Sequence, residues 1–376
     1  MKQLDSRSNR MPQFELLRVI SMLLIVMLHF MSHGGVNEKL VLGTPAYFIF
    51  SLFRTLAYLG VDCFILLSGY FLCESDFRLS RIVRTALQVL FYSCLGIVLA
   101  VASFHEKVGM KDLLFTLFPI SGNKYWFASA YIVMLFISPL LNNAIIHMDK
   151  KEHLTIALIL LISFSIIPTI LFWGKGVYSD GKDLGWFITL YIIAAYVRKY
   201  PSNLKKKNIG VLFCTSVILT VVIEFFIQFA ARKLVGSAPE KFLYYNNAPF
   251  VVVGGVLLLI WISGLNITRC EKLITEIGGL TFGVYLLHDN DLIRTNLWKL
   301  IDAPRFLNSV GLEILYMIGV IAAIFTVGCV VELARKTIVK MLHVEVFAGE
   351  IADNCYKKVR QIVDKFLNGE CDEDKN

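Results

Sequence analysis

Three ionisable side chains lie in a stretch that is otherwise almost entirely apolar. Residues 13–31 read QFELLRVISMLLIVMLHFM and contain Glu15, Arg18 and His29. Placing ionisable groups in hydrocarbon costs free energy, so we expect these side chains either to pair with other polar groups or to take part in a reaction. At about 100° per residue they fall on one narrow stripe of a helix, and Arg18 and His29 are separated by about 16 Å of rise. The pattern predicts a polar seam with Arg18 at a membrane face and His29 deep, which suits a site that is reached from one side and acts toward the other.

A signal anchor is the alternative explanation for this stretch. Arg18 would then mark the cytoplasmic end, and His29 would only bond a neighbouring helix. No small-residue cleavage site follows, and His29 interrupts the apolar core, so we expect the segment to be retained. The stretch alone does not separate an anchor from a reaction site.

Three arginines follow the second apolar run at successive i, i+3 positions. The sequence FRLSRIVR contains Arg78, Arg81 and Arg84, which line one face of a helix start. Guanidinium groups match phosphate oxygens bidentately, so these residues predict a cytoplasmic site for the phosphates of a nucleotide-like donor. The alternative is a topological signal that also contacts lipid headgroups.

Other candidate residues occur singly. Asp62 lies in the apolar run GVDCFILLSGYFL, where Ser68 and Gly69 permit close helix packing. Trp126 opens a later run as a candidate interfacial anchor. The expected span at 276–293 ends with TFGVYLLHDN, which places His288 near the outer face, where a satisfied interfacial histidine is the commoner explanation.

The composition places these residues in a membrane protein. The 376 residues are 56% hydrophobic, above the roughly 45–50% that is usual in soluble domains. Apolar runs of about 17–25 residues indicate spans, and an all-α bundle of about ten is expected here, at residues 14–33, 46–72, 82–104, 125–147, 153–173, 184–197, 208–231, 248–264, 276–293 and 310–333.

The distribution of lysine and arginine gives the expected orientation. Most of them fall in segments that lie inside if both termini are cytoplasmic, as the positive-inside rule requires. The net charge of +8 then reports topology and attraction to anionic lipids, not to nucleic acid. We expect a cytoplasmic segment at 1–13, a membrane domain at 14–335, and a cytoplasmic tail at 336–376 that is an amphipathic helix followed by a disordered acidic end.

In this order, the motifs resemble acyltransferase family 3, a family of integral membrane proteins that transfer acyl groups to cell-surface glycans and lipids. The resemblance covers residues 13–335. It is carried by an arginine and a histidine eleven residues apart, a G-V-x-x-F-F-x-x-S-G-F/Y pattern, an R-x-x-R pair, a W-F pair and a Y-L-x-H ending. The matching residues are Arg18, His29, Gly60, Val61, Phe64, Ser68, Gly69, Tyr70, Arg81, Arg84, Trp126, Phe127, Tyr285, Leu286 and His288.

The chain departs from the family pattern in three ways. Ile65 replaces the second phenylalanine, Glu15 stands where the family often has an aspartate or a longer polar lead, and the extracellular hydrolase-like domain of many members is absent. The last difference favours an O-acetyltransferase of exported polysaccharide in a bacterial plasma membrane.

The resemblance implies roles for the candidate residues. His29 would act as general base or would accept the acyl group as a nucleophile, together with Arg18. The donor, expected to be acetyl-CoA, would bind at Arg81, Arg84 and Arg78. The acceptor, a glycan or lipid-linked sugar, would meet the substrate-binding candidates His288, Trp126 and Asp62.

The expected partners are membrane lipids and the acceptor, with no permanently bound cofactor, no metal and no nucleic acid. A transporter or flippase of a lipid-linked sugar is the alternative function, because buried charges also line transport pathways. A structural partner in glycan synthesis is a further alternative.

Overall fold

The computed structural model describes residues 11–122, 124–171, 180–236 and 242–367. Within these ranges the regular elements are helices and no strand occurs, so the predicted all-α class is confirmed. The helices are α1 (Pro12–Ser32), α2 (Val36–Lys39), α3 (Pro45–Leu72), α4 (Leu79–Phe104), α5 (Met110–Leu117), α6 (Trp126–His147), α7 (Lys150–Leu161), the π-helical turn η1 (Ile162–Ile166), α8 (Ile167–Ile170), α9 (Leu184–Lys199), α10 (Lys206–Val235), α11 (Pro249–Ser263), α12 (Glu271–Gly278), α13 (Thr281–His288), α14 (Asp291–Ile301), α15 (Val310–Met341) and α16 (Val344–Leu367).

Seven of the helical segments in the described ranges are long and apolar enough to cross a membrane. They are α1, α3, α4, α6, the continuous run α7–η1–α8, α10 and α15. The shorter α9 and α11 coincide with the expected spans at 184–197 and 248–264. The chain is therefore a polytopic membrane protein, as its hydropathy predicts.

Local sequence signals set several helix starts. Proline occupies the first turn of α1, α3 and α11, where its missing N–H has no helical partner to lose. Asp149 caps α7 in a reciprocal pair of hydrogen bonds with Glu152, and Asp183 caps α9. These signals bring the observed ends within a few residues of the expected ones.

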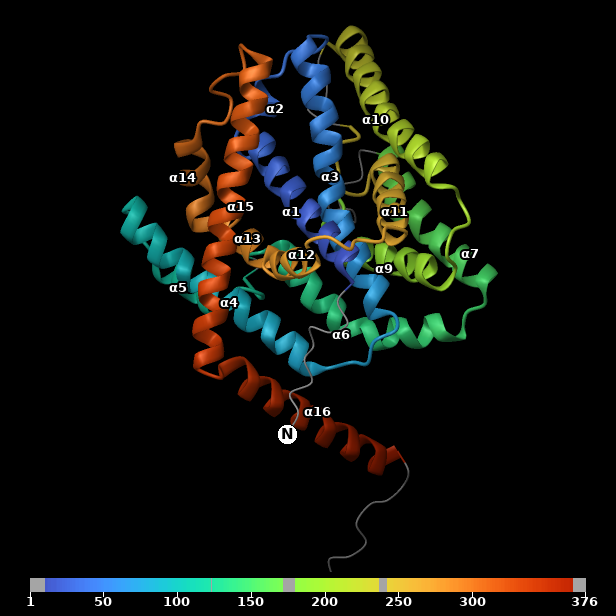
Figure 1. Ribbon diagram of the computed structural model, residues 1–376, viewed down its shortest axis with the longest axis vertical. Helices are drawn as coiled ribbons and strands as arrows, with labels where there is room; N and C mark the ends of the chain where they lie inside the picture. The colour runs from blue at the N-terminus through green and yellow to red at the C-terminus, as the bar shows by residue number, and fades with distance from the viewer. Residues whose placement is uncertain (1–10, 123, 172–179, 237–241, 368–376) are drawn as a thin grey trace, which may run out of the picture.

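Helix α1 lies in the middle of the bundle. It packs against α3, α12, α13 and α15, and Figure 1 shows it between α15 and α3. Phe14, Leu17, Val26 and Phe30 are almost fully buried along it. An element enclosed in this way can hold polar side chains away from lipid.

The structure differs from the expectation at residues 276–293. A single span was expected there, but α12 ends at Gly278, α13 begins at Thr281 and α14 begins at Asp291. At this break α12 ends close against α1. The glycine makes the close contact possible, because a Cβ atom on Gly278 would lie only 2.5 Å from Oε2 of Glu15. A hydropathy profile does not detect this packing. The profile therefore shows the short helices as one apolar run.

The C-terminal part also differs from the expected boundary at residue 335. Helix α15 continues to Met341, and Arg335 is buried in ion pairs with Glu332 and with Glu345 of α16. Helix α16 then crosses the end of the molecule at which α15 finishes (Figure 1) and packs on the start of α4. We call this end the α16 end. The acidic sequence expected to be disordered lies outside the described residues.

Candidate active site

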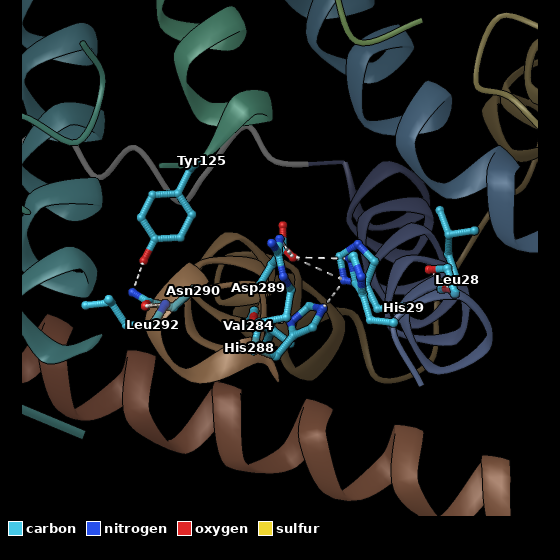
Figure 2. A network of polar contacts seen from close by, with 11 residues as sticks. Leu28, His29, Tyr125, Val284, His288, Asp289, Asn290 and Leu292 are labelled. Atoms are coloured by element: carbon cyan, nitrogen blue, oxygen red, sulfur yellow. Dashed lines mark hydrogen bonds and ion pairs between the residues drawn. The ribbon is translucent and has the colours of Figure 1, made fainter. Parts of the chain in front are cut away.

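His29 and His288 form a direct hydrogen bond although 259 residues separate them in sequence. Nδ1 of His29 lies 2.8 Å from Nε2 of His288. His29 is in the last turns of α1 and His288 is the last residue of α13, so the two helix ends meet (Figure 2). The structure thus unites the two histidines of the sequence motifs in one site.

The hydrogen bonds fix which nitrogen of each ring carries a proton. Nδ1 of His288 lies 2.6 Å from the carbonyl oxygen of Val284, and a carbonyl only accepts, so this nitrogen donates. In neutral His288, Nε2 must then accept from Nδ1–H of His29. The Nε2 atom of neutral His29 consequently keeps its lone pair, which is the feature that a base or nucleophile requires.

Asp289 places a carboxylate beside this pair. Its Oδ1 lies 3.9 Å from Nδ1 of His29, 3.8 Å from Nε2 of His33 and 3.1 Å from Nη1 of Arg294. The carboxylate is almost fully buried, whereas His33 and Arg294 are about one-third exposed. A buried negative charge near His29 stabilises the imidazolium that forms when the ring takes a proton.

Asn290 anchors the segment that carries His288 and Asp289. Its side-chain amide donates to the hydroxyl of Tyr125 at 2.5 Å and to the carbonyl of Tyr92 at 3.2 Å (Figure 2). Its Oδ1 accepts from the backbone N–H of Leu292 and caps α14. Gly96 of α4 lies directly against this amide, where a Cβ would come within 2.2 Å. The turn between α13 and α14 is therefore held from several sides.

His29, His33 and Asp289 bring three potential metal-ligand atoms within 4.8 Å of one another. Two features oppose a cation at this point. Arg294 places a positive charge on the same carboxylate oxygen, and Nδ1 of His29 carries the proton that it donates to His288. The group fits a hydrogen-bonded network better than a metal centre.

A small cavity adjoins His29. It has a volume of about 20 Å³, and its wall is otherwise apolar or aromatic: Met22, Ile25, Val61, Phe64, Trp126, Phe127, Phe282 and Tyr285. The structure thus brings the candidate Trp126 into the same site as His29. A space of this size beside an unprotonated ring nitrogen suits one methyl-sized group.

Arg18 lies further along α1, toward the α16 end. Its Nη1 donates to Oε1 of Glu15 at 2.6 Å, and its side chain is 31% exposed while that of Glu15 is 4% exposed. Arg18 is therefore paired and still accessible, and Glu15 neutralises it.

Asp62 has a tryptophan of α9 as its hydrogen-bond partner. The fully buried carboxylate accepts from Nε1–H of Trp186 at 3.1 Å. Among the residues that the structure describes, none forms a hydrogen bond with its Oδ2. The preceding residue, Val61, lines the cavity, so Asp62 lies behind the cavity wall.

The three arginines at 78–84 lie at the α16 end. Arg78 and Arg84 are exposed, and Arg81 donates to Oγ of Ser75 at 3.3 Å. Asp353 of α16 accepts from the N–H of Ser80 at 2.8 Å, so a carboxylate already sits at the first turn of α4.

Several site residues were missed in sequence. His33 lies four residues after His29, and this i, i+4 spacing on one helix face was a signal for it. Asp289 directly follows His288 in the chain, but no role was predicted for it. No local sequence pattern distinguishes Arg294, Asn290 or Tyr125. Their contacts depend on the break at 276–293, which the sequence does not reveal.

A family model described as an acyltransferase domain matches residues 11–333. No curated protein and no solved structure matches the chain significantly. The matched region contains the whole histidine network and the arginines of α4, and it ends before α16.

Proposed function

Because the chain belongs to acyltransferase family 3, we propose that it transfers an acetyl group from cytosolic acetyl-CoA to a hydroxyl of a cell-surface or lipid-linked glycan. The observation that carries the proposal is the hydrogen-bonded pair of His29 and His288 beside a methyl-sized cavity. A path for an intact substrate, as in a transporter, has no need of a ring nitrogen with a free lone pair.

In the direct mechanism, Nε2 of His29 takes the proton of the acceptor hydroxyl. The oxygen attacks the thioester carbonyl, a C–O bond forms, the C–S bond breaks, and the imidazolium returns its proton to the thiolate. Asp289 stabilises the imidazolium during this exchange. Transfer through an acylated Nε2 of His29 uses the same atoms and stays open.

The cavity supports a short acyl group. The space of about 20 Å³ beside His29 is close to that of one methyl group, and aromatic side chains form much of its wall. Acetyl is therefore the acyl group that the site favours, provided that the thioester binds with its methyl group in this cavity.

The arginines at the α16 end support a cytosolic, polyanionic donor. Arg81 and Arg84 lie where α4 begins, and Arg18 is accessible in the first half of α1. In this proposal the arginines bind the phosphates of the donor near one end of α1, and His29 lies near the other end. The thioester end of the donor would then extend along α1 from Arg18 to His29, over about 16 Å.

The test is transfer of labelled acetyl from acetyl-CoA to a membrane glycan acceptor at matched protein levels. We expect His29→Asn to insert normally, to retain acetyl-CoA binding, and to lose about 10²–10⁴-fold in turnover, the usual contribution of general-base catalysis. Parental transfer by His29→Asn would remove the histidine from the mechanism.

His288 gives a matched pair of variants. In His288→Gln an amide oxygen can still accept from Nδ1–H of His29, whereas His288→Leu keeps a similar volume without an acceptor. We expect the glutamine variant to retain more activity than the leucine variant. Equal activities would mean that the hydrogen bond does not orient His29.

A further inference from the structure

An apolar groove runs between α4, α14 and α15 and ends at the histidine network. Its volume is about 390 Å³, within the range of small-ligand sites. Its wall is formed by residues such as Leu99, Phe104, Leu297, Ile301, Val320 and Ala323, and its only polar side chains are those of Ser103 and His288. The groove therefore joins a lipid-like surface to a residue of the candidate active site.

Helix α14 forms one side of this groove with its apolar face. Ile293, Leu297 and Ile301 recur at i, i+4 spacing on the groove side. Asp291, Thr295 and Lys299 have the same spacing and are exposed. This division is typical of a helix at a membrane surface, with its apolar face toward hydrocarbon and its polar face toward water.

The opposite side belongs to α15, which is a candidate membrane span. Four residues of this helix line the groove about three to five turns from its start at Val310: Val320, Ala323, Ile324 and Val327. The groove thus lies under α14 at the depth of the lipid chains.

We propose that this groove binds the hydrocarbon chain of a membrane-anchored acceptor, so that the attached glycan is presented to His29. The inference rests on the proposed function and names its acceptor as one carried on a long apolar chain. His288 contributes to the groove wall and hydrogen-bonds His29, so a chain in the groove brings its polar head toward the site. The continuity with the histidine pair distinguishes this groove from a surface that only takes bulk lipid.

The test uses two acceptors with the same glycan, one attached to a long alkyl or prenyl chain and one free in water. The purified full chain is reconstituted in lipid discs and supplied with acetyl-CoA. We expect KM for the anchored acceptor to be at least tenfold lower than for the free one, because anchoring confines the glycan to the membrane and a chain in the groove raises its effective concentration at the histidine pair.

Two alanines of α15 provide a matched pair of variants. Both alanines are exposed, but Ala323 lines the groove and its neighbour Ala322 does not. Ala323→Phe fills the groove and should raise KM for the anchored acceptor about tenfold, with little change for the free one. Ala322→Phe adds the same ring to the lipid-facing surface and should behave like the parent.

The outcomes separate this inference from the proposed function. Parental KM values in Ala323→Phe, or equal use of both acceptors by the parent, would mean that the groove holds bulk lipid only, with the acyltransferase function intact. Failure of the parent to acetylate either acceptor would overturn the proposed function itself.

Discussion

The chemistry of the site depends on a chain of hydrogen bonds that begins at a backbone carbonyl. Val284 accepts from His288, and His288 in turn accepts from His29. Each ring is thereby held in one orientation and one tautomer. The fixed geometry means that no reorientation is needed when the proton moves, which is how preorganised sites lower a barrier.

Phe282 tests the acyl preference at the scale of one residue. Phe282→Ala enlarges the cavity next to His29, so we expect the variant to use propionyl-CoA and butyryl-CoA better than the parent does. The measurement is a competition among acyl-CoA donors with one acceptor. Phe53→Ala removes a phenylalanine that does not line the cavity and is the control. Unchanged donor preference in Phe282→Ala would place the acyl group elsewhere.

The individual site residues were partly predictable from sequence. His29 and Arg18 were predicted because ionisable groups in an apolar run cost free energy and so indicate a function. His288 was predicted because it lies near the end of such a run. Their partners were not predictable. The contact between His29 and His288 spans 259 residues, and nothing in the local sequence of either histidine specifies the other.

At the scale of helices, the break between α12 and α13 positions the site. Continuous helix would carry residues 281–288 along the axis of α12, whereas the break lets α13 pack against α1 and α15 independently. The glycine at the end of α12 makes this possible by admitting Glu15 of α1.

Gly278→Ala tests this packing. Its Cβ would meet Oε2 of Glu15 at 2.5 Å and the Glu15 carbonyl at 3.0 Å. The helices must separate, which typically costs about 1–3 kcal/mol. We expect a lower Tm in detergent and reduced acetyl transfer. The control is Gly319→Ala in α15, where nothing lies within 4 Å and no loss is expected. Equal melting of the two variants would contradict the argument.

Asp353 gives a pH prediction for α16. Burial raises the pKa of this carboxyl, but hydrogen bonds from Ser80 and the charges of Arg78 and Arg84 outweigh it, so the pKa lies below its usual 3.8. The contact between α16 and α4 should therefore be fully stabilised above about pH 4, and this stabilisation should be lost as the pH falls through the lowered pKa.

A spin label on the exposed Cys355 of α16, with the other cysteines replaced, reports this docking. In the parent the label should become more mobile only as the pH falls below about 4. Asp353→Asn, which cannot ionise, should show no such transition. Identical titrations of the two proteins would show that other groups control the docking.

Helix boundaries were largely predictable, and helix interruptions were not. The spans expected at 46–72 and 184–197 agree with α3 and α9 within two residues, because apolar runs and helix caps are encoded locally. The break within 276–293 and the burial of Arg335 depend on neighbours from distant parts of the chain, so composition and periodicity do not reveal them.

At the scale of the whole molecule, the donor argument depends on which end faces the cytoplasm. We predict that the α16 end is inside. In a cysteine-free background, Leu204→Cys, between α9 and α10, should resist a membrane-impermeant maleimide in intact cells, whereas Lys107→Cys, between α4 and α5, should react. Both positions are exposed. Labelling of position 204 from outside would reverse the orientation.

The distance in sequence between the two histidines also has a consequence for biogenesis. Ribosomes add about 5–20 residues per second, so His288 emerges on the order of tens of seconds after His29. With only eight residues, α13 is also far shorter than the ~20 residues of a self-inserting span. It must enter the bilayer with its neighbours. A nascent chain therefore holds His29 without His288 for most of its synthesis, and the histidine pair forms only when nearly the entire polypeptide has been made.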